Sequence, residues 1–319
     1  MKQMGYDVAV LHDYFVDRVM QCGTVWGLVS LVNSKAREGG GGIHGIRQMD
    51  VKGGNAVNLA HSLSTLGART LLITHSDPEH VQLLRNSFAG TGAELRIKPL
   101  PAGLTVALEG GVNVMLGDPR GAGSFGPELL DAEDWRGLGS AKVVCTVNWA
   151  ANRRGTELLV ALRGRLPGRT IFLATADVRD RMADYGRLVR RLRREKLADW
   201  LGLNEFEALA TARALGAATL GPREACMLIA RETGARVDVH TERVSFTCSG
   251  GRLEAARTRR VSPRRLTGAG DVWEAASIYA HLKGMCDRER LAFANAAAKL
   301  YVTSDGQRPP TSDEVIAAV

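Results

Sequence analysis

The sequence predicts an α/β fold with one mostly parallel sheet, because short apolar runs alternate along the chain with longer segments of helical period. The runs are rich in β-branched residues and short enough to be strands buried on both faces, which is typical of a parallel sheet covered by helices. The composition agrees, since 45% of the 319 residues are hydrophobic and 24% are charged. A disordered chain, a collagen-like repeat and a small disulfide scaffold are therefore excluded.

The expected strands and helices follow from this alternation in chain order. Strands are expected at 8–11, 70–74, 142–147, 170–174 and 237–240. Helices are expected at about 55–67, 79–90, 154–165, 181–198, 205–215, 222–233, 270–283 and 287–302. Neither an internal repeat nor a Pro- or Ser-rich linker divides the chain, so we expect a single domain over residues 1–319.

Two stretches interrupt the alternation and are expected to form an accessory β-element that projects from the main domain. Residues 18–52 include four consecutive glycines at 39–42, and residues 95–117 alternate as short strands around Gly110 and Gly111. Neither stretch has a helical period long enough to cover a sheet. A flexible loop is the alternative for each of them.

The net charge of +8 arises from 42 basic and 34 acidic residues. Such a balance suits nucleic acid or anionic small molecules. The densest basic run, 187–196, contains no aromatic residue that could stack on a base, so a solvated helix face is favoured over a nucleic-acid groove. No stretch approaches 18 consecutive apolar residues, so no membrane span is expected.

The five cysteines are scattered and form neither a C-x-x-C pair nor a metal-ligand spacing with histidine. Buried free thiols in a reducing cytoplasm are therefore expected, and a structural zinc site is not.

The segment Thr267-Gly268-Ala269-Gly270-Asp271 carries the strongest chemical signal. Small residues open a helix there, so consecutive backbone N–H groups can point at one anion, and the helix dipole favours negative charge at that place. Asp271 in the first turn suits a general base that takes a proton from an attacking hydroxyl, while the amides hold a transferring phosphoryl group. An N-cap aspartate on an ordinary helix is the alternative.

A second motif is Gly53-Gly54-Asn55, with Asn58 three residues later at the start of an expected helix. The glycines permit close approach of the backbone, and the two asparagines offer amides to hydroxyl groups. A simple turn before a helix would have the same pattern.

A third motif is Asn204 with Glu207, just after the apolar run 200–203. An Asn and a Glu three residues apart at a strand-to-helix turn can order the waters around a Mg²⁺ ion. A helix capping box has a similar pattern and is the alternative.

In this order and separation, the three motifs together resemble the ribokinase-like (phosphofructokinase B type) carbohydrate and nucleoside kinase family. The resemblance extends over nearly the whole chain, from the first strand to the segment 293–298. It implies a three-layer α/β/α sandwich with a mostly parallel sheet and a small β lid, to which 18–52 and 95–117 would belong. In many members the lid also forms a homodimer interface.

The resemblance further implies a cytoplasmic, ATP- and Mg²⁺-dependent kinase acting on a primary hydroxyl of a sugar, polyol or nucleoside. A phosphosugar acceptor would need basic lid residues, for which Arg47 and Lys52 are candidates, whereas a nucleoside would favour apolar ones such as Trp26. A non-catalytic sugar or nucleotide sensor on the same fold is a further alternative. The choice between ATP and ADP as donor stays open.

By resemblance, Asp271 is the catalytic base, and Gly268, Ala269 and Gly270 form the anion hole. The candidate acceptor-binding residues are Asp17, Gly54, Asn55, Asn58 and Asn148. The candidate nucleotide-binding residues are Asn204, Glu207, His240, Thr241, Gly268, Gly270 and Asn295, of which Asn204 and Glu207 would hold Mg²⁺ through water. A buried structural histidine is an equal alternative for His240, and a loop around a packed Trp149 is the alternative for Asn148.

One departure from the family pattern concerns a monovalent cation. Many members have Asp-Thr just before the glycine segment, where the Asp helps to bind the cation, but this chain has Arg265-Leu266. The Arg265 guanidinium would replace the cation, so no monovalent cation requirement is expected.

Overall fold

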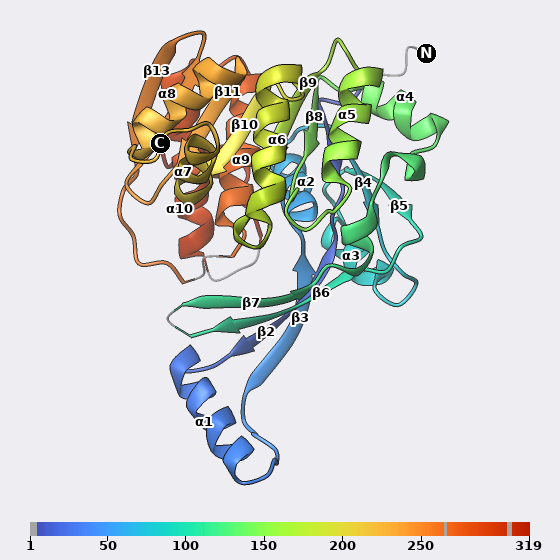
Figure 1. Ribbon diagram of the computed structural model, residues 1–319. Coiled ribbons are helices and arrows are strands. Elements are labelled where there is room, and N and C mark those ends of the chain that lie inside the picture. Colours follow the sequence, from blue (N-terminus) through green and yellow to red (C-terminus); the bar gives the residue numbers. More distant parts are fainter. Residues whose placement is uncertain (1–4, 111, 265–266, 305–307) are drawn as a thin grey trace.

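The computed structural model describes residues 5–110, 112–264, 267–304 and 308–319, and these form two sheets with helices around the larger one (Figure 1). The larger sheet has nine strands in the order β13-β12-β11-β10-β9-β8-β1-β4-β5. The strands from β11 to β5 are parallel to one another, and β12 and β13 are antiparallel additions at one edge. The expected α/β class with a mostly parallel sheet is confirmed.

The strands of this sheet include all five that were expected and four more. The expected ones are β1 (Val8–Leu11), β4 (Thr70–His75), β8 (Val143–Thr146), β9 (Thr170–Ala174) and β11 (Arg236–His240). The others are β5 (Glu94–Lys98), β10 (Trp200–Asn204), β12 (Val244–Ser249) and β13 (Arg252–Arg257). Alternate residues of β1 pack into different cores, Val8 and Val10 on one face and Ala9 and Leu11 on the other. The sheet is therefore the middle of three layers.

The helices divide between the two faces. On the face of Val8 and Val10 lie α2 (Asn55–Thr65), α3 (Val81–Ser87), α9 (Ala269–Leu282), α10 (Asp287–Thr303) and α11 (Ser312–Ile316). On the other face lie α4 (Ala132–Ser140), α5 (Gly155–Arg165), α6 (Met182–Glu195), α7 (Glu205–Ala214) and α8 (Pro222–Thr233). The expected helix at 79–90 is shorter, and α4 was not expected.

The basic run 187–196 lies mainly on α6 and has the amphipathic pattern expected of a solvated helix face. Leu188, Val189 and Leu192 are buried against the sheet, whereas Arg190 and Arg193 are exposed. The arginines thus follow the helical period of the outer surface.

The smaller sheet projects from the body as a lid (Figure 1). Its strands are β2 (Phe15–Gln21), β3 (Arg47–Gly53), β6 (Gly103–Glu109) and β7 (Asn113–Asp118), in the order β3-β2-β6-β7. The lid therefore begins before residue 18. Residues 94–98 pair with β4 in the large sheet, so the start at 95 was too early.

The lid also contains a helix, α1 (Val25–Arg37), where only β structure or a loop was expected. The Thr24 side chain accepts a hydrogen bond from the Gly27 N–H at 2.9 Å and caps the helix. Val25 and Leu28 are its only buried residues. The sequence did contain a helical signal, since Val25, Leu28, Val29 and Val32 stand at i, i+3, i+4 and i+7, and the prediction passed over it.

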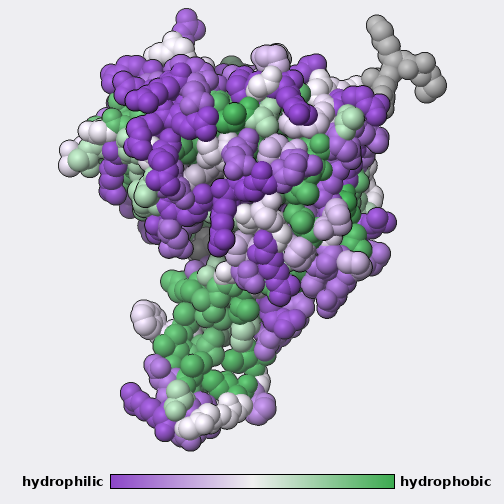
Figure 2. All heavy atoms as spheres, turned by 45° about the vertical axis from the view of Figure 1, so that its right-hand side comes forward, coloured by the Kyte–Doolittle hydropathy of each residue, from purple (hydrophilic) through white to green (hydrophobic). Residues whose placement is uncertain are grey.

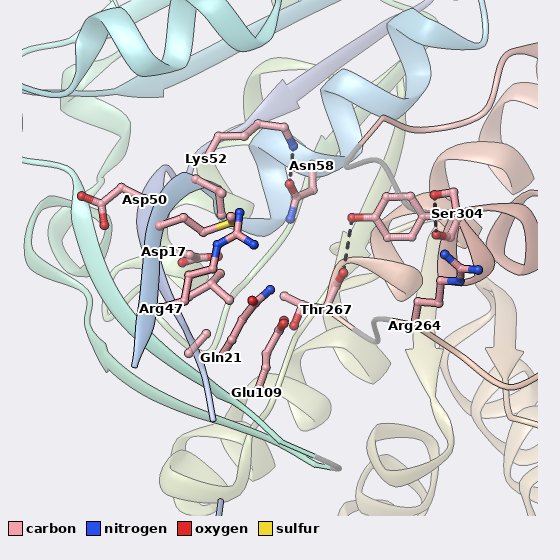
Figure 3. A pocket seen from close by; sticks show the side chains of 15 residues that line it. Asp17, Gln21, Arg47, Asp50, Lys52, Asn58, Glu109, Arg264, Thr267 and Ser304 are labelled. Carbon is pink, nitrogen blue, oxygen red and sulfur yellow. Dashed lines mark hydrogen bonds between the residues drawn. The ribbon is translucent and has the colours of Figure 1, made fainter. Parts of the chain in front are cut away.

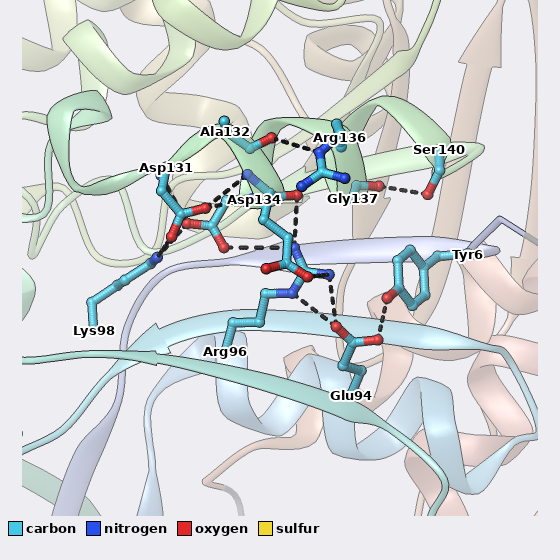
Figure 4. A network of polar contacts seen from close by, with 11 residues as sticks. Tyr6, Glu94, Arg96, Lys98, Asp131, Ala132, Asp134, Arg136, Gly137 and Ser140 are labelled. Carbon is cyan, nitrogen blue, oxygen red and sulfur yellow. Dashed lines mark hydrogen bonds and ion pairs between the residues drawn. The ribbon is translucent and has the colours of Figure 1, made fainter. Parts of the chain in front are cut away.

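A network of polar contacts fastens the edge strand β5 to α4 (Figure 4). The Lys98 ammonium contacts Asp131 at 2.9 Å, and Arg96 donates to the Glu133 carbonyl at 2.8 Å. The Tyr6 hydroxyl donates to Glu94 on the same strand. Because a helix and charged side chains cover it, this edge of the sheet is protected from pairing with another strand.

The burial of the cysteines differs in part from the expectation. All five cysteines are free thiols, but Cys286 is exposed and Cys22 is half-buried, so burial was wrongly expected for these two.

In the described part of the chain, no helix has both the length and the apolar character needed to cross a membrane.

A buried ion pair joins α9 and α10 to the sheet. Arg290 on α10 is 0% exposed and contacts both carboxylate oxygens of Asp238 on β11. Arg290 also donates to Thr247 Oγ1 at 2.8 Å, and Ser277 on α9 donates to Asp238 at 2.9 Å. Burial alone would raise the pKa of Asp238, but the Arg290 charge outweighs it and the pKa is lowered. The pair fixes α9 against the sheet.

We expect Arg290→Ala to lower the free energy of unfolding by about 3–5 kcal/mol, because it leaves the Asp238 carboxylate buried without its counter-charge. Urea unfolding at pH 7 measures this change. The matched control is Arg288→Ala on the exposed side of α10, which should stay within about 0.5 kcal/mol of the parent. Equal stability of the Arg290 variant and the parent would contradict the assignment.

Candidate active site

A buried carboxylate, Asp13, forms the floor of the site just after β1. Asp13 is 0% exposed and accepts hydrogen bonds from the backbone N–H groups of Asn55 at 2.9 Å and Ala56 at 2.8 Å. The Asn148 side-chain amide donates to it at 2.7 Å. Burial raises the pKa of Asp13, and these three donors act in the opposite direction. Asp13 was not among the expected site residues, although a polar residue directly after a buried strand was a signal for it.

The carboxylate of Asp271 lies in the first turn of α9 and is held by α2. Asn55 Nδ2 donates to Asp271 Oδ1 at 2.7 Å, and Asn58 Nδ2 donates to Oδ2 at 3.0 Å. Lys52 Nζ in turn donates to Asn58 Oδ1 at 2.6 Å. Burial raises the pKa of Asp271 to about 7, against the effect of both amides. A carboxylate that titrates near neutral pH suits a general base.

Asp17 lies on β2 of the lid and faces the same space. A Cβ atom at residue 53 would collide with the Asp17 carboxylate, so glycine there leaves the carboxylate in its present position. Burial raises the pKa of Asp17 to about 6, and a hydrogen bond with Thr105 acts to lower it. Thr105 is a second residue that the sequence did not single out.

The glycine segment before α9 requires a special backbone. Gly268 has φ +83°, and a Cβ atom on it would lie 2.8 Å from the Tyr301 hydroxyl oxygen. The Tyr301 hydroxyl also donates to the Thr267 carbonyl at 3.3 Å. From the lid, Asn113 on β7 donates to the Thr267 hydroxyl. The lid and the glycine segment are thus in direct contact.

The structure brings all five expected acceptor residues together with the expected base. A cavity of about 490 Å³ lies between the lid and the main body. Its lining includes Asp17, Gly54, Asn55, Asn58, Asn148, Gly268 and Asp271.

A second cavity, of about 410 Å³, lies on the other side of the glycine segment. Its lining includes the expected residues His240, Thr241, Ala269, Gly270 and Asn295. The Asn295 side-chain oxygen accepts a hydrogen bond from Trp273 Nε1 at 2.8 Å, and the His240 ring lies 5.1 Å from the Trp273 ring. Burial lowers the pKa of His240 to about 4, so the ring is neutral at pH 7.

Asn204 and Glu207 form a capping box at the start of α7. Glu207 N–H donates to Asn204 Oδ1 at 2.9 Å, and the Asn204 amide donates to Glu207 Oε1 at 2.7 Å. Asn204 also lines a third cavity, of about 680 Å³, with His240 and Thr241. Burial raises the pKa of Glu207 to about 8, and the charges of Asp177 and Asp271 add to this effect. The Asn204 amide therefore reaches the third cavity, and the Glu207 carboxyl lies directly behind it, with both of its oxygens bonded to Asn204.

Two further candidates from the sequence are Trp26 and Arg265. Trp26 is 78% exposed on α1 and lines none of the cavities described above. Arg265 and Leu266, on which the cation expectation depends, lie outside the described residues.

The chain has been compared with known proteins by sequence and by structure. No protein-family model matches it, and no curated protein matches it. A probable sugar kinase from Rhizobium etli CFN 42 aligns with a TM-score of 0.81 at 19% identity, over 99% of this chain and 98% of the other. An adenosine kinase from Sinorhizobium meliloti aligns with a TM-score of 0.80 at 19% identity, over 98% of both chains.

A ribokinase from Arabidopsis thaliana, complexed with ribose and ATP, aligns with a TM-score of 0.74 at 18% identity, over 99% of both chains. The alignments cover the body and the lid together, since each spans nearly the full length. At these identities the likeness concerns the fold. The chain therefore has the three-layer ribokinase-like fold that its motifs indicated.

Proposed function

We propose that this protein is a kinase that transfers the γ-phosphoryl group of ATP to a primary hydroxyl of a sugar, polyol or nucleoside. One observation carries the proposal: the segment Gly268–Asp271 separates two cavities. Asp271 faces the cavity next to the lid, and Gly270 lines the other. A nucleotide in the second cavity would place its terminal phosphate at the N-terminus of α9, next to a hydroxyl in the first.

In the proposed reaction, the oxygen of the acceptor hydroxyl forms a bond to the γ-phosphorus, and Asp271 accepts the proton that this hydroxyl loses. The bond from that phosphorus to the β–γ bridging oxygen breaks, and ADP leaves. The amides from Gly268 to Gly270 and the α9 dipole stabilise the charge on the transferring group. Asn55 and Asn58 hold Asp271 in position, and Asp17 accepts hydrogen bonds from acceptor hydroxyls.

Mg²⁺ belongs to the proposal because Asn204 lines a cavity together with His240 and Thr241, and the Glu207 carboxyl is bonded to Asn204 from behind. A bound Mg²⁺ ion would neutralise charge on the nucleotide phosphates. Among proteins of similar structure, a putative ribokinase II from E. coli has been described in complex with ATP and Mg²⁺. A monovalent cation is not part of the proposal, because Arg265 stands where many family members have the aspartate of the cation site.

The alternative of a non-catalytic sensor is less well supported. A sensor needs no carboxylate with a pKa near 7 at the meeting point of two cavities, and Asp271 has both properties. An assay of phosphate transfer to a panel of sugars and nucleosides separates the two functions, because a sensor would bind these acceptors without phosphorylating them.

Asp271→Asn should reduce turnover by about 10²–10⁴-fold, because the amide cannot take the proton of the acceptor hydroxyl. The assay is phosphate transfer from ATP to a panel of sugars and nucleosides. In the parent, turnover should fall as the pH drops below about 7, where Asp271 becomes protonated. Asp313→Asn, on the exposed α11, is the matched control. An Asp271 variant with parental turnover would refute the assigned base.

Glu207→Gln should raise the Mg²⁺ concentration for half-maximal activity by about tenfold or more, because it removes a carboxylate from the metal environment. A Mg²⁺ titration at saturating acceptor measures this, and the acceptor KM should not change. Glu254→Gln on the exposed β13 is the control. An unchanged Mg²⁺ dependence would remove Glu207 from the metal site.

We further propose that two copies of the chain associate through the outer face of the lid. Apolar side chains gather on the lid surface (Figure 2). They include the exposed Trp26, Leu31 and Val32 on α1 and Val114 and Leu116 on β7. Contiguous exposed apolar surface is typical of a protein interface. Val114 and Leu116 alternate with Met115, which lines the acceptor cavity, so they face away from it.

The parent should therefore sediment at twice its 34.3 kDa mass. The double variant Val114→Glu and Leu116→Glu should sediment as a monomer, because association would bury its two carboxylates. Ile316→Glu, an exposed apolar site outside the lid, is the control and should remain dimeric. A monomeric parent at micromolar concentration would contradict the dimer.

A further inference from the structure

A polar cavity of about 700 Å³ extends the acceptor site along the inner face of the lid (Figure 3). Asp17, Asn58 and Thr267 line both this cavity and the 490 Å³ acceptor cavity. A molecule whose hydroxyl reaches Asp271 can thus also extend into this space. The combined volume is more than a single sugar ring fills, so a second chemical group of the acceptor has room there.

The walls of this polar cavity carry three basic residues. Arg47 and Lys52 lie on β3, and Arg264 lies on the opposite wall (Figure 3). The Arg47 side chain projects into the cavity and makes no hydrogen bond or ion pair with any residue in the described part of the chain. Arginine presents a planar fork of N–H donors that matches the oxygens of a phosphate group.

The sheet register places Arg47 well beyond the sugar-binding part of the site. Arg47 pairs with Gln21, whereas Val51 pairs with Asp17. Four residues along a strand correspond to about 13 Å, part of which the long arginine side chain spans. A group bound by Arg47 would therefore be at a different end of the acceptor from the hydroxyl at Asp271.

The acidic residues of the cavity do not cancel the preference of its basic residues for a phosphate group. Both oxygens of Asp50 accept hydrogen bonds from Arg18, each at 2.8 Å. Asp17 and Glu109 remain, and carboxylates of this kind accept hydrogen bonds from sugar hydroxyls. The cavity thus offers acceptors to hydroxyl groups and cationic donors to an anion.

The same lining argues against a nucleobase. Tyr301 is the one aromatic residue among those that line the cavity, and its hydroxyl donates to the Thr267 carbonyl. Trp26 is exposed on α1 and does not line the cavity. The apolar part of the described lining is aliphatic (Val19, Met49, Val51 and Ala107), so Tyr301 is the one ring there on which a base could stack.

We propose that the acceptor is a sugar or polyol that already carries a phosphate monoester, bound between Arg47 and Arg264 with Lys52 beside it. This inference rests on the proposed kinase function and specifies its acceptor. The existing phosphate stays unreacted in the polar cavity, and the free primary hydroxyl at the other end of the molecule is the one that Asp271 deprotonates.

Matched acceptors test the proposal: D-fructose against D-fructose 6-phosphate and D-fructose 1-phosphate, each of which has a free primary hydroxyl. The parent should have a higher kcat/KM for a phosphorylated member. Arg47→Gln and Arg264→Gln should each raise its KM by about 10- to 100-fold, the loss of one charge-assisted hydrogen bond, with kcat little changed. The kcat/KM for the free sugar should fall much less than that for the phosphorylated sugar.

Arg37→Gln is the matched control, since it removes the same charge from the exposed end of α1 in the lid without touching the cavity. Preference of the parent for the free sugar, with no effect of either cavity variant, would overturn the inference and leave the kinase assignment intact.

A binding measurement makes the inference independent of turnover. Calorimetric titration of Asp271→Asn with D-fructose and D-fructose 6-phosphate should give tighter binding of the phosphorylated sugar. Adding Arg47→Gln and Arg264→Gln should abolish the difference. Equal binding of the two sugars by Asp271→Asn would overturn the inference, even if no acceptor is phosphorylated by the parent and the kinase assignment fails.

Discussion

The buried Asp13 carboxylate sets the position of nearly everything else in the site. Its three hydrogen bonds join the end of β1 to the first turn of α2 and to Asn148 after β8. Burying a carboxylate without such donors would lower the stability of the fold by several kcal/mol. Moving any of the three segments away from Asp13 is therefore unfavourable. Since the first turn of α2 carries Asn55, and Asn58 follows one turn later, the same bonds position the two amides that hold Asp271.

The parts of this arrangement that could be predicted from the sequence are those fixed by local rules. Strand–helix alternation predicted the parallel sheet, because buried strands and amphipathic helices differ in period. The glycine segment predicted the backbone before α9, where φ +83° at Gly268 excludes a side chain. The Asn204 and Glu207 pattern predicted a helix start, but it could not separate a capping box from a metal environment, because the same side chains suit both.

The parts that could not be predicted depend on long-range contacts. The end of β1 marks Asp13 as a polar residue at the sheet edge, but its partners Asn55 and Asn148 lie 42 and 135 residues away, so local sequence does not show that α2 begins opposite it. β5 has the composition of a lid strand, yet pairing with β4 places it in the body. The helix α1 is a different case, because Val25, Leu28, Val29 and Val32 do have helical spacing, and the glycines at 39–42 drew the prediction toward a loop or β structure.

The order of the chain has a consequence for how the protein is made. In the lid, β2 is flanked by β3 and by β6, and Phe15 pairs with Gly103. Synthesis proceeds from the N-terminus, so β2 cannot complete its pairing until β6 has emerged from the ribosome much later. Asn148 follows, and α9, which carries Asp271, emerges later still. A nascent chain that has not yet released α9 therefore has no complete place for an acceptor, and the emergence of α9 is the step that completes one.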